Sequence, residues 1–71
     1  MRIILFGASG QLGLELARVL SVRHEVIKVY NSSEVEGGYR LDITDFSRLE
    51  DFIIKKRPAV VINAAAMTDV D

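Results

Sequence analysis

The sequence predicts an α/β fold in which helices cover both faces of a parallel β-sheet, and three observations carry this prediction. Short apolar runs alternate with amphipathic segments in the order β-α-β-β-α-β. The apolar runs at residues 2–6 and 59–63 are continuous, as in strands buried on both faces of such a sheet. The intervening segments are long enough for right-handed helical crossovers, which favour the strand order 3-2-1-4.

The first part of the chain predicts a strand, a helix and a second strand. Residues 2–6 (RIILF) end at a glycine and form the first strand. A helix is expected over residues 11–20, since apolar residues recur there at helical spacing. Its sheet-facing side would carry Leu12, Leu16, Val19 and Leu20. Residues 24–30 (HEVIKVY) are rich in β-branched side chains and predict the second strand.

The second part predicts a turn, a short strand and another helix before the last strand. Residues 31–38 (NSSEVEGG) have the composition of a turn, and residues 39–41 predict a short third strand. Thr44 or Asp45 would cap a second helix that ends before Pro58. The buried face of this helix would carry Phe46, Leu49, Phe52 and Ile53.

Three glycines spaced three apart stand between the first strand and the first helix, in the stretch GASGQLG. Gly7 would allow a tight turn out of the strand. Gly10 would leave the backbone bare where a pyrophosphate approaches, and Gly13 would let the helix pack closely on the sheet. An alternative is that all three glycines serve only the packing of the strand against the helix.

The start of the predicted helix supports a phosphate site. Free N–H groups near Gln11 and Leu12, together with the helix dipole, favour an anion there. Ser9 would donate a hydrogen bond to phosphate or cap the helix. The spacing is G-x-x-G-x-x-G rather than the G-x-G-x-x-G of ordinary dehydrogenases, but its place between strand and helix predicts dinucleotide binding.

Two further segments would lie beside the glycine loop, at the crevice where the carboxyl ends of the strands meet, because both follow predicted parallel strands. Asp42 would accept a hydrogen bond from an adenine amino group, or would instead tighten the turn before the second helix. Ile43 would meet the base edge through its backbone and cover the ring with its side chain. Ala64, Ala65 and Ala66 would let a flat ligand lie against the backbone, or would form a close-packed turn.

The end of the second predicted strand bears on the choice of cofactor. An NAD-selective site usually carries Asp or Glu there for the ribose 2′-hydroxyl, whereas this chain has Tyr30, Asn31, Ser32 and Ser33. Without a carboxylate a 2′-phosphate is admissible, and the amide and hydroxyl groups would bind it. The nearest arginine along the chain is Arg40. The pattern favours NADP(H), with NAD(H) as the alternative.

Composition narrows the class of protein. Nine basic and ten acidic residues give a net charge of −1, so the chain lacks the excess positive charge that is typical of nucleic-acid-binding proteins. The absence of cysteine excludes disulfides and thiolate metal sites, and no metal site is predicted. No apolar run approaches the ~20 residues of a membrane span, and no signal peptide precedes the first strand. We therefore expect a cytoplasmic protein without a membrane partner.

Three segments together resemble the extended short-chain dehydrogenase/reductases and, among them, the dTDP-4-dehydrorhamnose reductases. They are residues 7–13 (GASGQLG), 41–45 (LDITD) and 63–71 (NAAAMTDVD). The resemblance covers the whole chain and is weakest in its middle. Met67 departs from it, since the family usually has an aromatic residue there, and Ala59 replaces an aspartate.

The resemblance assigns residues to a cofactor site. It implies a pyrophosphate held by Gly7, Ser9, Gly10, Gln11 and Leu12, an adenine met by Asp42 and Ile43, and riboses lined by Ala64, Ala65 and Ala66. Thr68 would lie near the nicotinamide or the substrate. On this basis residues 1–71 are the N-terminal portion of an NAD(P)-binding Rossmann domain, and the rest of that domain and the substrate-binding part lie outside them.

The resemblance also implies a reaction. In the family, a hydride passes from a reduced nicotinamide to the 4-keto group of dTDP-4-dehydro-L-rhamnose (6-deoxy-L-lyxo-4-hexulose), giving dTDP-L-rhamnose. A Tyr-x-x-x-Lys pair performs this chemistry, and neither Tyr30 nor Tyr39 has lysine four residues later. No catalytic residue is therefore expected within this chain. The full-length protein would bind a dTDP-linked sugar and would be a candidate homodimer.

Two other functions stay open on the same fold. One is a non-catalytic NADP-binding regulatory subunit, like the β subunit of methionine adenosyltransferase, which resembles these reductases. The other is a reductase or epimerase of a different nucleotide sugar. The glutamine in the glycine loop and the alanine run favour the dTDP-rhamnose reaction.

Overall fold

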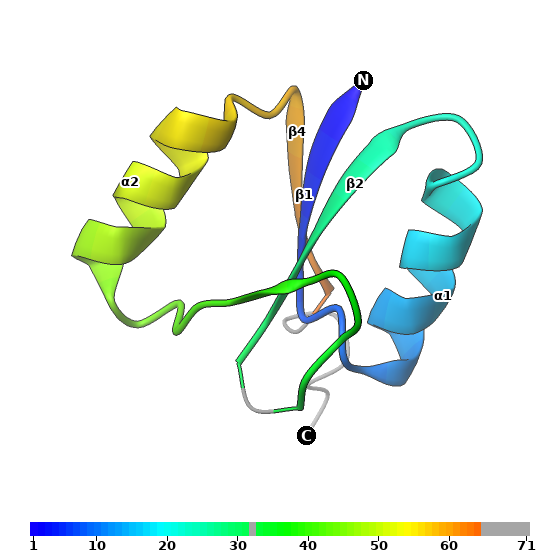
Figure 1. Cartoon of the computed structure of the whole chain (residues 1–71), viewed down its shortest axis with the longest axis horizontal. Helices are drawn as coiled ribbons and strands as arrows, with labels where there is room; N and C mark the ends of the chain where they lie inside the picture. Colours follow the sequence, from blue (N-terminus) through cyan, green and yellow to red (C-terminus); the bar gives the residue numbers. More distant parts are fainter. Residues whose placement is uncertain (32, 65–71) are drawn as a thin grey trace.

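A four-stranded parallel sheet runs through the middle of the molecule in the order β3-β2-β1-β4, which confirms the predicted fold class and strand order (Figure 1). The computed structural model describes residues 1–31 and 33–64. The elements are β1 (Arg2–Phe6), α1 (Gln11–Leu20), β2 (Glu25–Tyr30), β3 (Tyr39–Arg40), α2 (Phe46–Lys56) and β4 (Val60–Asn63). Neither helix is long and apolar enough to cross a membrane.

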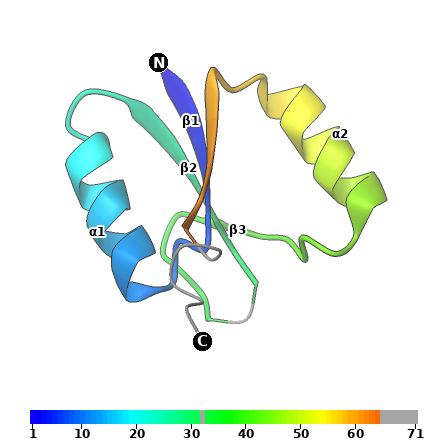
Figure 2. The same ribbon diagram turned by 180° about the vertical axis from the view of Figure 1, so that it is seen from behind.

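The two helices lie on opposite faces of the sheet, as the front and back views show (Figure 1 and Figure 2). The alternation of side chains along β1 divides the core accordingly. Ile4 and Phe6 point toward α2 and pack with residues of β2, whereas Leu5 points toward α1 and packs with Ala8 and Ala17. Because β1 is central, it is buried on both faces, as its continuous apolar run predicts.

Helix α1 approaches the sheet most closely at small residues. A Cβ at Gly13 would lie 2.1 Å from the carbonyl oxygen of Gly7, and Ala17 is buried one turn later. The predicted packing face of α1 is therefore partly wrong, since Leu12 and Val19 are 36% and 52% exposed. The contact is centred on the glycine and the alanine, and this rotates both larger side chains toward solvent.

Helix α2 begins at the predicted cap and ends in a left-handed residue. The Asp45 side chain accepts a hydrogen bond from the backbone N–H of Arg48 at 3.3 Å. At the other end Arg57 has φ 50° and its N–H bonds the carbonyl of Ile53, which closes the helix before Pro58. Phe46 was expected on the buried face but is 76% exposed, since it is the first residue of α2 and the helix packs on the core through Leu49, Phe52 and Ile53.

Strand ends differ from the sequence prediction by single residues, and β4 differs in burial. Residues 24, 41 and 59 fall outside the strands that the structure has. The expectation that β4 is buried on both faces is wrong, since Val60 and Val61 are 39% and 46% exposed. Strand β4 pairs with β1 along one edge, and no described element pairs with its other edge.

The Gly13 contact generates a stability prediction. Gly13→Ala should lower the free energy of unfolding by about 3 kcal/mol or more, since the new Cβ meets backbone that cannot move aside cheaply. Gly10→Ala is the matched control, because its Cβ would lie 3.6 Å from the nearest atom, in ordinary contact. The control should be neutral or stabilising by up to about 1 kcal/mol. Urea denaturation followed by circular dichroism measures both, and equal stabilities would contradict the packing role.

Candidate functional site

The chain leaves β1 through a tight turn at the carboxyl end of the sheet. Gly7 has φ 75°, a left-handed conformation that favours glycine, as predicted. The N–H of Gly10 donates to the carbonyl of Gly7 at 3.2 Å, and the N–H of Ala8 donates to Val29 of β2 at 3.1 Å. These bonds hold the loop against the end of the neighbouring strand.

Different physical constraints account for the three glycines of this loop. The backbone angle accounts for Gly7, and contact with the loop backbone accounts for Gly13. Gly10 has an extended backbone at φ −75° and ψ 167°, and a Cβ there would meet no atom closer than 3.6 Å. Backbone conformation therefore explains Gly7 and packing explains Gly13. Neither reason requires a glycine at position 10.

The start of α1 presents free backbone donors. Gly10 is the N-cap residue and no side chain caps the helix, so the alternative that Ser9 caps it is wrong. Within the described part of the chain, the N–H groups of Gln11 and Leu12 have no hydrogen-bond partner. The first turn also has no acidic side chain. The helix start therefore offers its amides and the positive end of its dipole to an anion.

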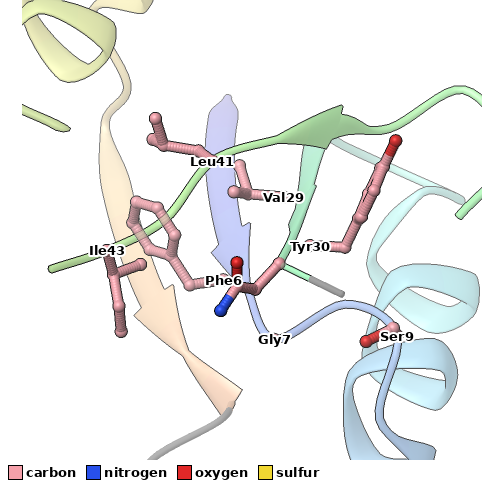
Figure 3. Close-up of a pocket in the computed structure, with 8 residues that line it drawn as sticks. Phe6, Gly7, Ser9, Val29, Tyr30, Leu41 and Ile43 are labelled. Atoms are coloured by element: carbon pink, nitrogen blue, oxygen red, sulfur yellow. The ribbon is translucent and has the colours of Figure 1, made fainter. Parts of the chain in front are cut away.

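A pocket of about 180 Å³ lies where β1 and β2 end, beside the glycine loop (Figure 3). It is lined by Phe6, Gly7, Ser9, Val29, Tyr30, Asn31, Leu41 and Ile43. Pockets that enclose a whole small ligand usually measure about 300–1,000 Å³, so this one suits a single part of a larger molecule.

The pocket has an apolar side and a polar side. Figure 3 shows Phe6 of β1 between Leu41 and Ile43, which come from the segment after β3. Ile43 is 37% exposed, so it offers free apolar surface here. Ser9 lies across the pocket at the entry to α1. A flat ring against the apolar side would thus place polar substituents toward the glycine loop.

The structure brings together only some of the residues that the sequence assigns to the site. Those that line the pocket are Gly7, Ser9, Asn31 and Ile43. Gly10, Gln11 and Leu12 follow in the same loop and helix start, outside the pocket lining. Ser32, Ala65, Ala66 and Thr68 lie outside the described residues. Sequence reasoning missed Phe6, Val29 and Leu41, although their positions at strand ends were a usable signal.

Ala64 is fully buried and packs with Leu5, Ala8 and Ala17 on the α1 side of the sheet. Its methyl group therefore belongs to the core beneath the glycine loop. Ala65 and Ala66 lie outside the described residues. A close-packed turn and a ligand against the backbone of the alanine run therefore both stay predictions.

Asp42 tightens the turn before α2, which is one of the two roles that the sequence allows for it. Its Oδ1 accepts from the Thr44 backbone N–H at 2.9 Å and from the Thr44 hydroxyl at 2.7 Å. The hydroxyl bond first, and then the amide bond, hold the pKa of Asp42 below its ordinary value. Both bonds use one oxygen, so a contact from Oδ2 to an adenine stays a prediction.

A family model described as "RmlD substrate binding domain" matches residues 1–71, the entire chain. The chain belongs to this family. The family assignment agrees with the resemblance drawn from residues 7–13, 41–45 and 63–71.

Named relatives in this family are reductases of a dTDP-linked sugar. A dTDP-4-dehydrorhamnose reductase of Streptomyces griseus is 40% identical over 99% of this chain and 21% of its own length. The Escherichia coli enzyme of that name is 39% identical over the whole chain and 23% of its own length. A crystal structure of a hypothetical dTDP-4-dehydrorhamnose reductase from Sulfolobus tokodaii shares 79% identity and a TM-score of 0.88, over 100% of this chain and 26% of that one. The chain thus spans about a quarter of these proteins or less.

The Asp42 turn generates a prediction on pH. Thr44→Val removes the hydroxyl donor, so the pKa of Asp42 should rise toward its ordinary value of 3.8. Because the folded-state pKa of wild type is the lower one, its stabilising effect is present above pH 3.8 and lost as the pH falls through the folded pKa. Titration of the carboxyl carbon by NMR measures the shift. Thr44→Ser, which keeps the hydroxyl, should titrate like wild type, and an unshifted Thr44→Val would refute the cause.

Proposed function

We propose that this chain is the N-terminal portion of an NAD(P)-binding Rossmann domain in a dTDP-4-dehydrorhamnose reductase. The whole protein would use NADPH to reduce dTDP-4-dehydro-L-rhamnose to dTDP-L-rhamnose. Residues 1–71 would supply cofactor binding, and the catalytic Tyr-x-x-x-Lys pair would lie outside them.

The observation that carries this proposal is the bare backbone at Gly10. Within residues 1–31 and 33–64, Gly10 and its two chain neighbours aside, no atom lies closer than 3.6 Å to the position where a Cβ would stand, and the angles there suit any residue. A glycine at this point therefore leaves room for a ligand. The adjacent amides of Gln11 and Leu12 lack partners in residues 1–31 and 33–64, so a pyrophosphate would fill the space and accept their hydrogen bonds.

The adenosine end of the cofactor fits the pocket of Figure 3. An adenine ring would lie against the exposed apolar side chain of Ile43, and Oδ2 of Asp42 would accept from its amino group. Asn31 follows β2 and carries no carboxylate, which is why the cofactor proposed is NADP(H) rather than NAD(H).

The bound nicotinamide would supply the hydride for reduction of the sugar ketone. The described residues contribute binding and orientation: the helix start holds the pyrophosphate, and the pocket fixes the adenosine. Fixing both would position the far end of the cofactor beyond the carboxyl end of β4, where substrate and catalytic groups of the remaining protein would meet it.

Names of the relatives support the substrate class, and one of them favours a second candidate. A protein of Streptomyces antibioticus, 37% identical over the whole chain, is named a probable dTDP-4,6-dihydroxy-2-methyloxan-3-one 4-ketoreductase. Reduction of that dTDP-linked ketone is therefore the alternative substrate assignment for the same cofactor site.

Turnover by the full gene product tests the assignment. Oxidation of NADPH, followed at its absorbance maximum, should require dTDP-4-dehydro-L-rhamnose and should yield dTDP-L-rhamnose by chromatography. Turnover of only the alternative dTDP-ketone would transfer the proposal to that substrate. Nucleotide binding without reduction of either sugar would instead indicate the regulatory-subunit function.

Substitution of Gly10 tests the cofactor site directly. Gly10→Val should weaken NADPH binding by at least about a hundredfold, since its branched side chain would occupy the space of the pyrophosphate. Fluorescence titration of NADPH measures this, and circular dichroism checks that the variant is folded. Gly10→Ala should weaken binding less. A folded Gly10→Val protein with unchanged affinity would refute the site.

A further inference from the structure

A second cavity adjoins the pocket of Figure 3. It has a volume of about 290 Å³, and Asn31 and Leu41 line both cavities. Its remaining lining is charged and consists of Arg40, Asp42, Asp45 and Arg48. Two arginines from separate elements, one in β3 and one in α2, therefore meet beside the residue that follows β2.

We propose that Arg40 and Arg48 bind the 2′-phosphate of NADP(H) in this cavity and thereby set the preference for that cofactor. The proposal rests on the proposed function and adds the residues that would bind the 2′-phosphate. An adenosine in the neighbouring pocket would direct its ribose toward Asn31, which the two cavities share. A guanidinium group matches phosphate in both charge and hydrogen-bond geometry.

Both arginines have guanidinium N–H donors that no described residue accepts. Within residues 1–31 and 33–64, Arg40 makes no ion pair and no side-chain hydrogen bond. Arg48 pairs with Asp45 through Nε alone, at 3.6 Å from Oδ2, and its side chain is 80% exposed. A guanidinium carries five N–H donors, so the terminal nitrogens of both residues stay available for a phosphate.

The two carboxylates of the cavity already have partners. Oδ1 of Asp42 accepts two hydrogen bonds from Thr44. Asp45 caps α2 through Oδ1 and faces Nε of Arg48 through Oδ2. Asp45 is the ion-pair partner of Arg48, whereas Arg40 has no ion-pair partner in the described residues. A phosphate beside Arg40 would give that guanidinium an anionic partner and would also be attracted by Arg48.

A competing location lies on the other side of the glycine loop. The cavity there is also lined by Ser9, and its charged residues are Lys28, Glu34 and Glu36. Two carboxylates and one cation give that cavity a net charge of −1, whereas the two cations and two carboxylates of the arginine cavity give a net charge of zero. The balance of charge favours the arginine cavity.

The test compares two fragments of the cofactor by isothermal titration calorimetry on the full gene product. Adenosine 2′,5′-bisphosphate should bind about tenfold or more tightly than 5′-AMP, since charge-assisted bonds to the 2′-phosphate are added. Arg40→Gln and Arg48→Gln should each reduce that ratio about five- to tenfold and leave the affinity for 5′-AMP within about twofold. The ratio should also fall as salt is raised.

Arg23→Gln is the matched control, because it removes the same charge between α1 and β2, at the end of the strands opposite the site. It should keep the wild-type ratio. Equal binding of the two fragments by wild type would overturn the proposal while leaving nucleotide binding intact. A ratio that survives both arginine substitutions and is lost in Lys28→Gln would also overturn it. Failure of both fragments to bind would refute the proposed function itself.

Discussion

The close contact of α1 with the end of β1 is the constraint on which the rest of the structure depends. Gly13 lets the helix backbone rest on the carbonyl of Gly7, and the buried Ala8 and Ala17 complete the contact. This contact fixes where the helix begins relative to the strand ends. The free amides at the helix start, the bare backbone of Gly10 and the neighbouring pocket are therefore held in one place. Any larger residue at the contact would displace them together.

The sequence predicts the architecture well because each element has strong local signals. The apolar run of β1, the turn chemistry at Gly7 and the aspartate cap of α2 all depend on near neighbours in the chain. Right-handed crossovers then leave little choice of strand order. The same locality made the glycine loop recognisable, and the structure separates the reasons for its glycines, which the spacing alone does not do.

What the sequence misses depends on contacts between distant segments. Apolar spacing marks Val19 and Phe46 as core, yet the small contact area of α1 and the position of the first turn of α2 leave them exposed. A continuous apolar run does not say what covers β4. Alanines after a strand are compatible with either a ligand site or a packed core, and the structure places Ala64 in the core. Arg48 joins Arg40 only through the packing of α2 beside β3, which no local pattern encodes.

Strand β3 is short, and this couples the pocket of Figure 3 to local folding. Tyr39 and Arg40 pair with β2 at the edge of the sheet, and the N–H of Leu41 adds a hydrogen bond to Tyr30. The contacts of Tyr39 with Phe52 and Lys56 hold the strand against α2. This segment leads directly into one wall of the pocket, so it can open while β1, β2 and β4 stay paired. The affinity for a ligand in this pocket would then include the free energy of keeping this edge closed. Substitutions at the contact between Tyr39 and Phe52 would change that affinity through the strand, although neither residue lines the pocket.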